Sequence, residues 1–262
     1  MKLRSIIRKI KQIISRKDDK DMCNFYSFLT DEKGNRYTMC HEVREKIRNG
    51  KLSLREDSHA SIAVLHHVDE DKCNKFEFNP LTKKLTLDTQ NLPFNDSELI
   101  NIDELMEEVK EAVPELIIKP IVNRFVDRKF DGEITEEIIG LVKEWDSVMD
   151  SVRDSVMDSV SDSVCDSVWD SVRDSVWDSV SDSVWDSVWD SVWDSVRDSV
   201  SDSVSDSVWY TVMAYISSFF NIKYNHDFSS VIKLWDMGLV PSFDGKVWRL
   251  NSYKGVVWEG EI

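Results

Sequence analysis

The Cys and His side chains are the residues of this sequence whose types best suit metal binding. Zinc sites in proteins combine Cys and His at short, recurring spacings, and the spacings in this chain match none of them. The chain also lacks a Gly-rich phosphate loop and the G-x-S-x-G, H-E-x-x-H and C-x-x-C motifs. We therefore predict no metal site, no cofactor and no enzymatic activity, with an enzyme whose site lies in residues 18–144 as the alternative. The residues considered are Cys40, His41, His59, His66, His67 and Cys73.

Aspartate offers a second kind of chemistry, because carboxylates bind Ca²⁺. From Trp145 to Val208 the unit x-Asp-Ser-Val occurs sixteen times without interruption. Its sixteen Asp and three Arg give the array a charge of −13, out of −16 for the chain. Calcium-binding solenoid repeats depend on Gly-rich turns, and this unit contains no Gly. A solvated acidic face is therefore the predicted role of the Asp residues.

The first position of the unit is the variable one, with six Trp, four Ser, three Arg, two Met and one Cys. Clustered exposed aromatic side chains mark interaction surfaces, so these positions are candidates for binding a protein, a glycan or a second copy of the chain. Neutral variation of the position is the alternative. The candidate residues are Trp177, Trp185, Trp189, Trp193, Arg173 and Arg197.

A four-residue period restricts the shape of the array. In an α-helix each Val would lie about 40° beyond the previous one, so no face would stay apolar. Asp residues would also repel each other at i,i+4. In a β-solenoid, each unit would form one short side of a coil with Val inside. We predict a β-solenoid rod, with a long α-helix as the alternative and disorder as a third.

Charge spacing adds an alternative that depends on the solenoid. Coils of 16 residues rising about 4.8 Å would carry one Asp per roughly 1.2 Å, against about 1.7 Å per charge in duplex DNA. Such a rod would imitate DNA towards a basic protein. In a helix Asp would recur only every roughly 6 Å, and the imitation would fail.

The flanking segments predict an α+β protein with a small N-terminal α+β domain and a small β-rich C-terminal cap. Apolar alternation, turn residues and helix-capping residues predict the elements. They are hairpins at 25–39, 75–87 and 239–250, helices at 42–48, 58–67, 97–112, 133–144 and 229–237, and a strand at 256–258. The predicted units are residues 1–17, a basic amphipathic helix, 18–144, the α+β domain, 145–216, the repeat rod, and 217–262, the cap.

The first 17 residues carry a charge of +7 and an apolar stripe at helical spacing. Docking on an anionic membrane surface is one interpretation. Docking on an acidic protein, including the array itself, and plain packing on the domain core are the others. No run of 18 apolar residues and no secretory signal is present, and the four Cys are scattered. We expect a cytoplasmic protein, membrane-peripheral if the first interpretation holds. The stripe consists of Leu3, Ile6, Ile7, Ile10, Ile13 and Ile14.

Three stretches together resemble uncharacterised proteins of phage-like and metagenomic origin that carry tetrapeptide arrays of the SVxD type. They are Lys75-Phe76-Glu77-Phe78-Asn79-Pro80, the array, and the closing segment Gly238 to Leu250, which reads GLVPSFDGKVWRL. The resemblance covers about a third of the chain. It implies an organisation of head, array and cap, and no reaction.

These features predict a non-enzymatic binding or scaffold protein whose acidic, Trp-bearing array is an interaction surface. The predicted partner is a protein, a basic one in the charge-based interpretation, with self-association as an alternative. A −13 array repels nucleic acid, so no direct nucleic-acid binding is expected. A peripheral membrane protein anchored by residues 2–17, and a DNA-mimicking rod, are the alternative functions.

Overall fold

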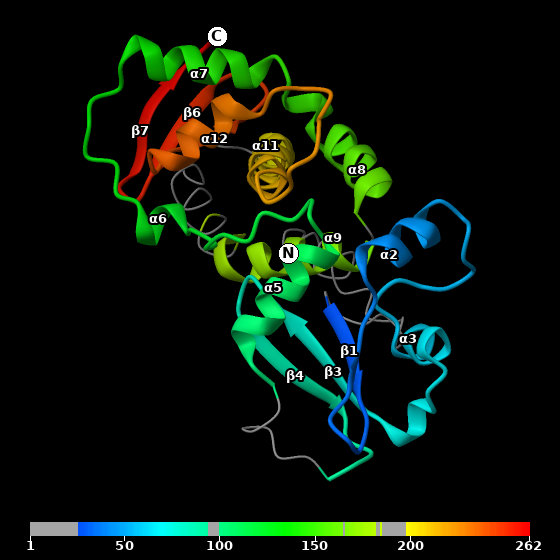
Figure 1. The fold of residues 1–262 in the computed structure, drawn as a ribbon. Helices are drawn as coiled ribbons and strands as arrows, with labels where there is room; N and C mark the ends of the chain where they lie inside the picture. Colours follow the sequence, from blue (N-terminus) through cyan, green and yellow to red (C-terminus); the bar gives the residue numbers. More distant parts are fainter. Residues whose placement is uncertain (1–25, 94–99, 165, 182–183, 185–197) are drawn as a thin grey trace.

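The computed structural model describes residues 26–93, 100–164, 166–181, 184 and 198–262 (Figure 1). It is an α+β protein with two antiparallel sheets. The basic helix predicted for residues 1–17 lies outside these ranges. Among the helices that are described, none combines the length and the apolar character needed to cross a bilayer.

The N-terminal sheet has the strand order β2-β1-β3-β4 and is antiparallel throughout. Its strands are β1 (Tyr26–Thr30), β2 (Arg36–Tyr37), β3 (Asn74–Asn79) and β4 (Lys84–Thr89). Phe28 pairs with Phe76 in the register, and their stacked rings face the main core. The next residue, Leu29, points to a separate small cluster with Met39 and Ile62. The two faces of β1 are therefore both covered, and the two predicted hairpins are confirmed.

Three helices flank this sheet, and two of them, α3 and α5, begin after a residue whose side chain caps the helix. Helix α2 (His41–Arg48) ends at Asn49, and α3 (His59–His66) begins at Ser58, whose side chain accepts a hydrogen bond from the Ser61 amide. Asn101 caps α5 (Ile102–Ala112) in the same way. Such caps satisfy amide groups that the first helical turn leaves unpaired. The helices predicted at 42–48 and 58–67 are confirmed within a residue or two, and that predicted at 97–112 is confirmed from Ile102 onward.

The described repeat units are helical, so the predicted β-solenoid is wrong for them. The alternative of one long helix is also wrong, because the array is broken into segments. Its elements are the end of α7 (Glu136–Asp146), the 3₁₀ turn η2 (Met149–Ser151), α8 (Val152–Ser163), α9 (Asp166–Val176), the π-helix η3 (Trp177–Ser181) and α11 (Asp198–Ser217).

These breaks keep the Val residues pointing inward. Within α8 the Val stripe drifts by about 40° per unit. The drift ends at Val164, whose backbone is extended at φ −134°, ψ 147°. In η3 the wider π-helical turn, about 4.4 residues, moves the next Val back by roughly 30°. The Val residues that are 0–1% exposed are Val152, Val156, Val160, Val164, Val168, Val172, Val176, Val180, Val184, Val204 and Val208.

Helix α11 lies at the centre of the array, with α8 and α9 packed against it (Figure 1). Three of the Ser residues that precede a Val join the array to the rest of the chain by hydrogen bonds. Ser155 accepts from the Asn225 amide at 3.2 Å, Ser175 from the Asn79 side chain at 2.7 Å, and Ser207 from the Phe243 amide at 2.9 Å. The described part of the array therefore belongs to the molecule's main core and is not a separate rod.

The C-terminal part forms a second antiparallel sheet of order β5-β6-β7, beside α12. Its elements are α12 (Ser229–Asp236), β5 (Val240–Phe243), β6 (Trp248–Ser252) and β7 (Gly255–Gly260), as the sequence predicts within a few residues. Gly238 has φ +83°, and a Cβ there would lie 2.8 Å from the Arg128 carbonyl oxygen. Helix α7 packs against α12. A further four-residue helix, α6 (Arg124–Asp127), precedes α7.

The inward Val residues predict a measurable asymmetry between buried and exposed positions. Replacing Val156, which is fully buried in α8, by Ala should lower the free energy of unfolding by about 2 kcal/mol, because apolar area and packing are lost. The same change at Val64, 62% exposed on α3, should cost less than about 0.5 kcal/mol. Urea denaturation followed by circular dichroism measures both. Equal effects would contradict the inward placement of the array's Val residues.

Candidate functional site: one histidine and two glutamates

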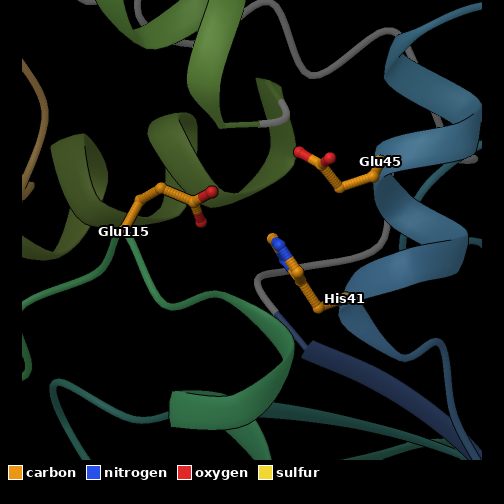
Figure 2. A group of neighbouring side chains, drawn as sticks. All are labelled: His41, Glu45 and Glu115. Carbon is orange, nitrogen blue, oxygen red and sulfur yellow. The ribbon is translucent and has the colours of Figure 1, made fainter.

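His41, Glu45 and Glu115 bring one imidazole and two carboxylates to a single point (Figure 2). One ligand atom from each lies within 4.8 Å of the others. His41 and Glu45 are four residues apart on α2, which places them on the same side of that helix. Glu115 comes from the turn after α5, and its side chain points across to them. Residues 70 positions apart in the sequence therefore converge.

A buried ion pair fixes the position of α2. Nη1 and Nη2 of Arg44 each donate to the Asp57 carboxylate at 2.6 Å, and both residues are fully buried. Arg44 Nε also donates to the Met39 carbonyl at 3.1 Å. A bidentate pair of this kind sets direction as well as distance. It therefore orients the helix that carries His41 and Glu45.

Glu115 is held by its backbone and by one of its carboxylate oxygens. Its carbonyl accepts from the Asn221 amide at 2.7 Å, and the next residues pair with the end of α11, where the Ile117 amide donates to the Phe219 carbonyl at 2.7 Å. Its Oε1 lies 3.6 Å from Arg48 Nη1. Arg48 also makes two hydrogen bonds to Glu56, at 2.9 and 3.2 Å. The Arg48 guanidinium therefore orients Oε1 of this carboxylate, and Oε2 is the oxygen that Arg48 does not hold.

Two polar atoms of the cluster are buried without a hydrogen-bond partner. They are Nδ1 of His41 and Oε2 of Glu115. A buried polar atom that lacks a partner costs free energy, roughly 1–3 kcal/mol, so such atoms call for an explanation. A pocket of about 260 Å³ opens along α2 on the side of His41 and Glu45. His41 and Glu45 line it, together with Glu42, Lys46, Asn49 and Lys51.

A second group with suitable side chains is His59, Glu77 and Asp88. Here the imidazole already has partners: Nε2 lies 3.0 Å from the Phe76 carbonyl oxygen, and Nδ1 lies 4.0 Å from an Asp88 oxygen. None of its side-chain atoms is among the described buried atoms that lack a partner. This group is therefore explained as a structural contact between α3 and the sheet.

The residues predicted as an interaction surface divide into two groups. Trp185, Trp189, Trp193 and Arg197 lie outside the described residues. Of the other two, Trp177 is half-buried with its ring centroid 4.8 Å from that of Trp209, and Arg173 forms ion pairs with its neighbours Asp170 and Asp174.

The variable position of the repeat does not always face outward. Trp145 is fully buried, and Trp169 is 3% exposed with its ring against Phe220. The Asp position behaves differently. The Asp side chains of the array whose exposure is described are exposed, except that of Asp170, which is half-buried. Asp is therefore the residue of the unit that consistently meets solvent.

Sequence reasoning missed the His41 cluster for an identifiable reason. Standard zinc spacings relate His41 only to Cys and other His residues, and those spacings do not include carboxylates. A readable signal was present, because His41 and Glu45 have the i,i+4 spacing that places two ligands on one helix face. Nothing in the sequence indicates Glu115, whose proximity depends on the pairing of its turn with the end of α11.

Comparison with known proteins adds no relative: no family model, no curated protein and no solved structure matches this chain. The resemblance to tetrapeptide-array proteins therefore stays a prediction.

The ion pair beneath α2 predicts a large effect of one small substitution. Asp57 has φ +52°, a conformation that Asn also tolerates. Asp57→Asn thus keeps the backbone but leaves the Arg44 charge buried without its main counter-charge. We expect the free energy of unfolding to fall by about 3 kcal/mol or more, measured by urea denaturation. The exposed Asp71 is the control, where Asp71→Asn should change stability by less than about 0.5 kcal/mol.

Proposed function

We propose that this protein is a non-enzymatic binding protein that engages a basic protein partner through the exposed Asp residues of its repeat array. The observation that carries this proposal is the opposite burial of two residues in one unit. Val is inward and Asp is outward in the described helical units, except that Asp170 is half-buried. A repeated unit therefore produces a repeated acidic surface, which attracts cationic partners and raises their rate of association.

Helix α8 presents the most regular part of this surface. Asp154, Asp158 and Asp162 are exposed and follow one another at i,i+4. Met157, 42% exposed, lies among them and offers an apolar contact. Carboxylates at this spacing repel each other by roughly 0.2–0.5 kcal/mol per pair. A basic partner would relieve that repulsion on binding.

Carboxylates of η2, α8 and α11 contribute to one negative field around Tyr210. The pKa of Tyr210 on α11 is raised, first by burial and then by the Asp206 and Asp150 carboxylates. Phenol ionisation is disfavoured where negative charge accumulates. Carboxylates from separate segments of the array therefore act together on one surface.

The DNA-mimic alternative requires the close Asp spacing of a solenoid. The described repeat units are helical, so this spacing is not met in them. The peripheral-membrane alternative depends on residues 2–17, none of which is described. We therefore propose the acidic surface with a basic protein as its partner.

Charge repulsion on α8 predicts that removing one charge stabilises the protein. Asp158 has Asp at both i−4 and i+4, so Asp158→Asn should raise the free energy of unfolding by about 0.5 kcal/mol. Asp170 is the matched control, because Arg173 lies 2.8 Å from it at i+3. Asp170→Asn should leave stability unchanged or slightly lower. Thermal unfolding at low salt measures the difference, and the gain at Asp158 should shrink as salt is added.

Binding to an oligolysine peptide, followed by fluorescence anisotropy, tests the proposed surface directly. Affinity should fall at least tenfold between about 50 and 200 mM salt, as expected for exposed charges. The triple variant D154N/D158N/D162N should weaken binding more than E104Q/E107Q/E111Q, which removes the same charge from α5. Equal weakening by the two variants would attribute binding to net charge alone and refute the assignment to the array.

A further inference from the structure

We propose that His41, Glu45 and Glu115 bind a single divalent transition-metal ion of the Zn²⁺ class. The donor set favours this class, because imidazole suits Zn²⁺, Fe²⁺ and Ni²⁺, whereas Ca²⁺ and Mg²⁺ prefer oxygen ligands alone. One nitrogen and two carboxylate oxygens make three protein ligands. A tetrahedral ion would then keep one position for water or another small ligand.

The spacing of the donor atoms is close to what such an ion requires. Ligand atoms about 2.1 Å from a tetrahedral ion lie roughly 3.4 Å from each other. The three ligand atoms already lie within 4.8 Å of one another. Side-chain movements of about 1 Å close that difference, and Glu45, the exposed member, is free to make the largest one.

The buried atoms without partners are the second, independent observation. A hydrogen-bond explanation of the cluster would pair the imidazole with a carboxylate, but Nδ1 of His41 and Oε2 of Glu115 have no such partner. Coordination would satisfy the Glu115 oxygen and balance the two negative charges. An imidazole coordinated through one nitrogen presents the other as a hydrogen-bond donor.

The surroundings of the ligands resemble the supporting contacts of metal sites. Arg48 lies beside the outer oxygen of Glu115 and is itself held by Glu56 and by the Ser163 carbonyl, to which it donates at 2.6 Å. Contacts of this kind orient ligands and tune their basicity. The Arg44–Asp57 pair fixes α2 in the same way. The pocket beside His41 and Glu45 gives an ion a path from solvent.

Coordination would connect parts of the molecule that are distant in sequence. Helix α2 packs beside the N-terminal sheet, while the Glu115 turn is hydrogen-bonded to residues that follow α11. An ion shared by the two would therefore couple the sheet to the array. Binding only to the folded state stabilises it, so the melting temperature should rise with metal concentration.

The test uses the full chain without a polyhistidine tag, stripped with a chelator and then titrated with Zn²⁺ in excess Mg²⁺. The excess Mg²⁺ occupies the exposed Asp residues, which bind cations without selectivity. We expect one Zn²⁺ per chain by calorimetry and a raised melting temperature. Replacing Zn²⁺ by Co²⁺ should give the visible absorption of a low-coordinate site.

Isosteric variants locate the binding. Glu115→Gln and Glu45→Gln should each weaken Zn²⁺ binding at least tenfold and abolish the rise in melting temperature. Asp88→Asn, in the His59 group, is the matched control and should leave both unchanged. Glu45 is exposed, so its variant tests the site even if the Glu115 variant does not fold. The proposal is overturned if wild type binds no Zn²⁺ in excess Mg²⁺, or if Glu45→Gln binds it as tightly as Asp88→Asn does.

Discussion

The fold depends on one constraint, which is that the Val recurring every fourth residue packs into the interior at every described unit from Val152 onward, while Val148 is half-buried. Burying a Val contributes about 1.5–3 kcal/mol, while Asp, Ser and Val together lower helix stability by roughly 1.5 kcal/mol per unit relative to Ala. Burial therefore decides the outcome. A straight helix would not keep the stripe inward, and the array accordingly changes direction at Val164 and widens into a π-helix at Trp177–Ser181.

This constraint explains which parts of the fold were predictable. Elements defined by local chemistry agree with the sequence: Ser58 caps α3, Asn79 leads into the turn before β4, and Asp244 accepts amide hydrogen bonds in the turn before β6. The array was not predictable in this way. Periodicity excludes one straight helix. Whether shorter helical segments are stable depends on what each Val packs against. That packing is set by the central position of α11, which is a tertiary property.

The candidate site follows the same division. His41 and Glu45 are close in sequence, and their spacing of four residues on one helix can be read from the sequence alone. The position of Glu115 is not local, because it depends on the Asn221 amide and on pairing between the α5 turn and the end of α11. The support from Arg48 is equally non-local, since one guanidinium contacts Glu115, Glu56 and the last residue of α8, Ser163.

The array therefore has two sides with different roles. Its inner side fixes the core, and through Ser163 and the residues after α11 it also frames the His41 cluster. Its outer side keeps the Asp residues, whose mutual repulsion works against the helices that carry them. The charges on the outward side of α8 therefore favour solubility over helix stability. Inner and outer residues alternate within one four-residue unit. Insertion or deletion of whole units preserves both sides, whereas a shift of two residues would place Asp at the buried Val positions, where an unpaired charge is strongly unfavourable.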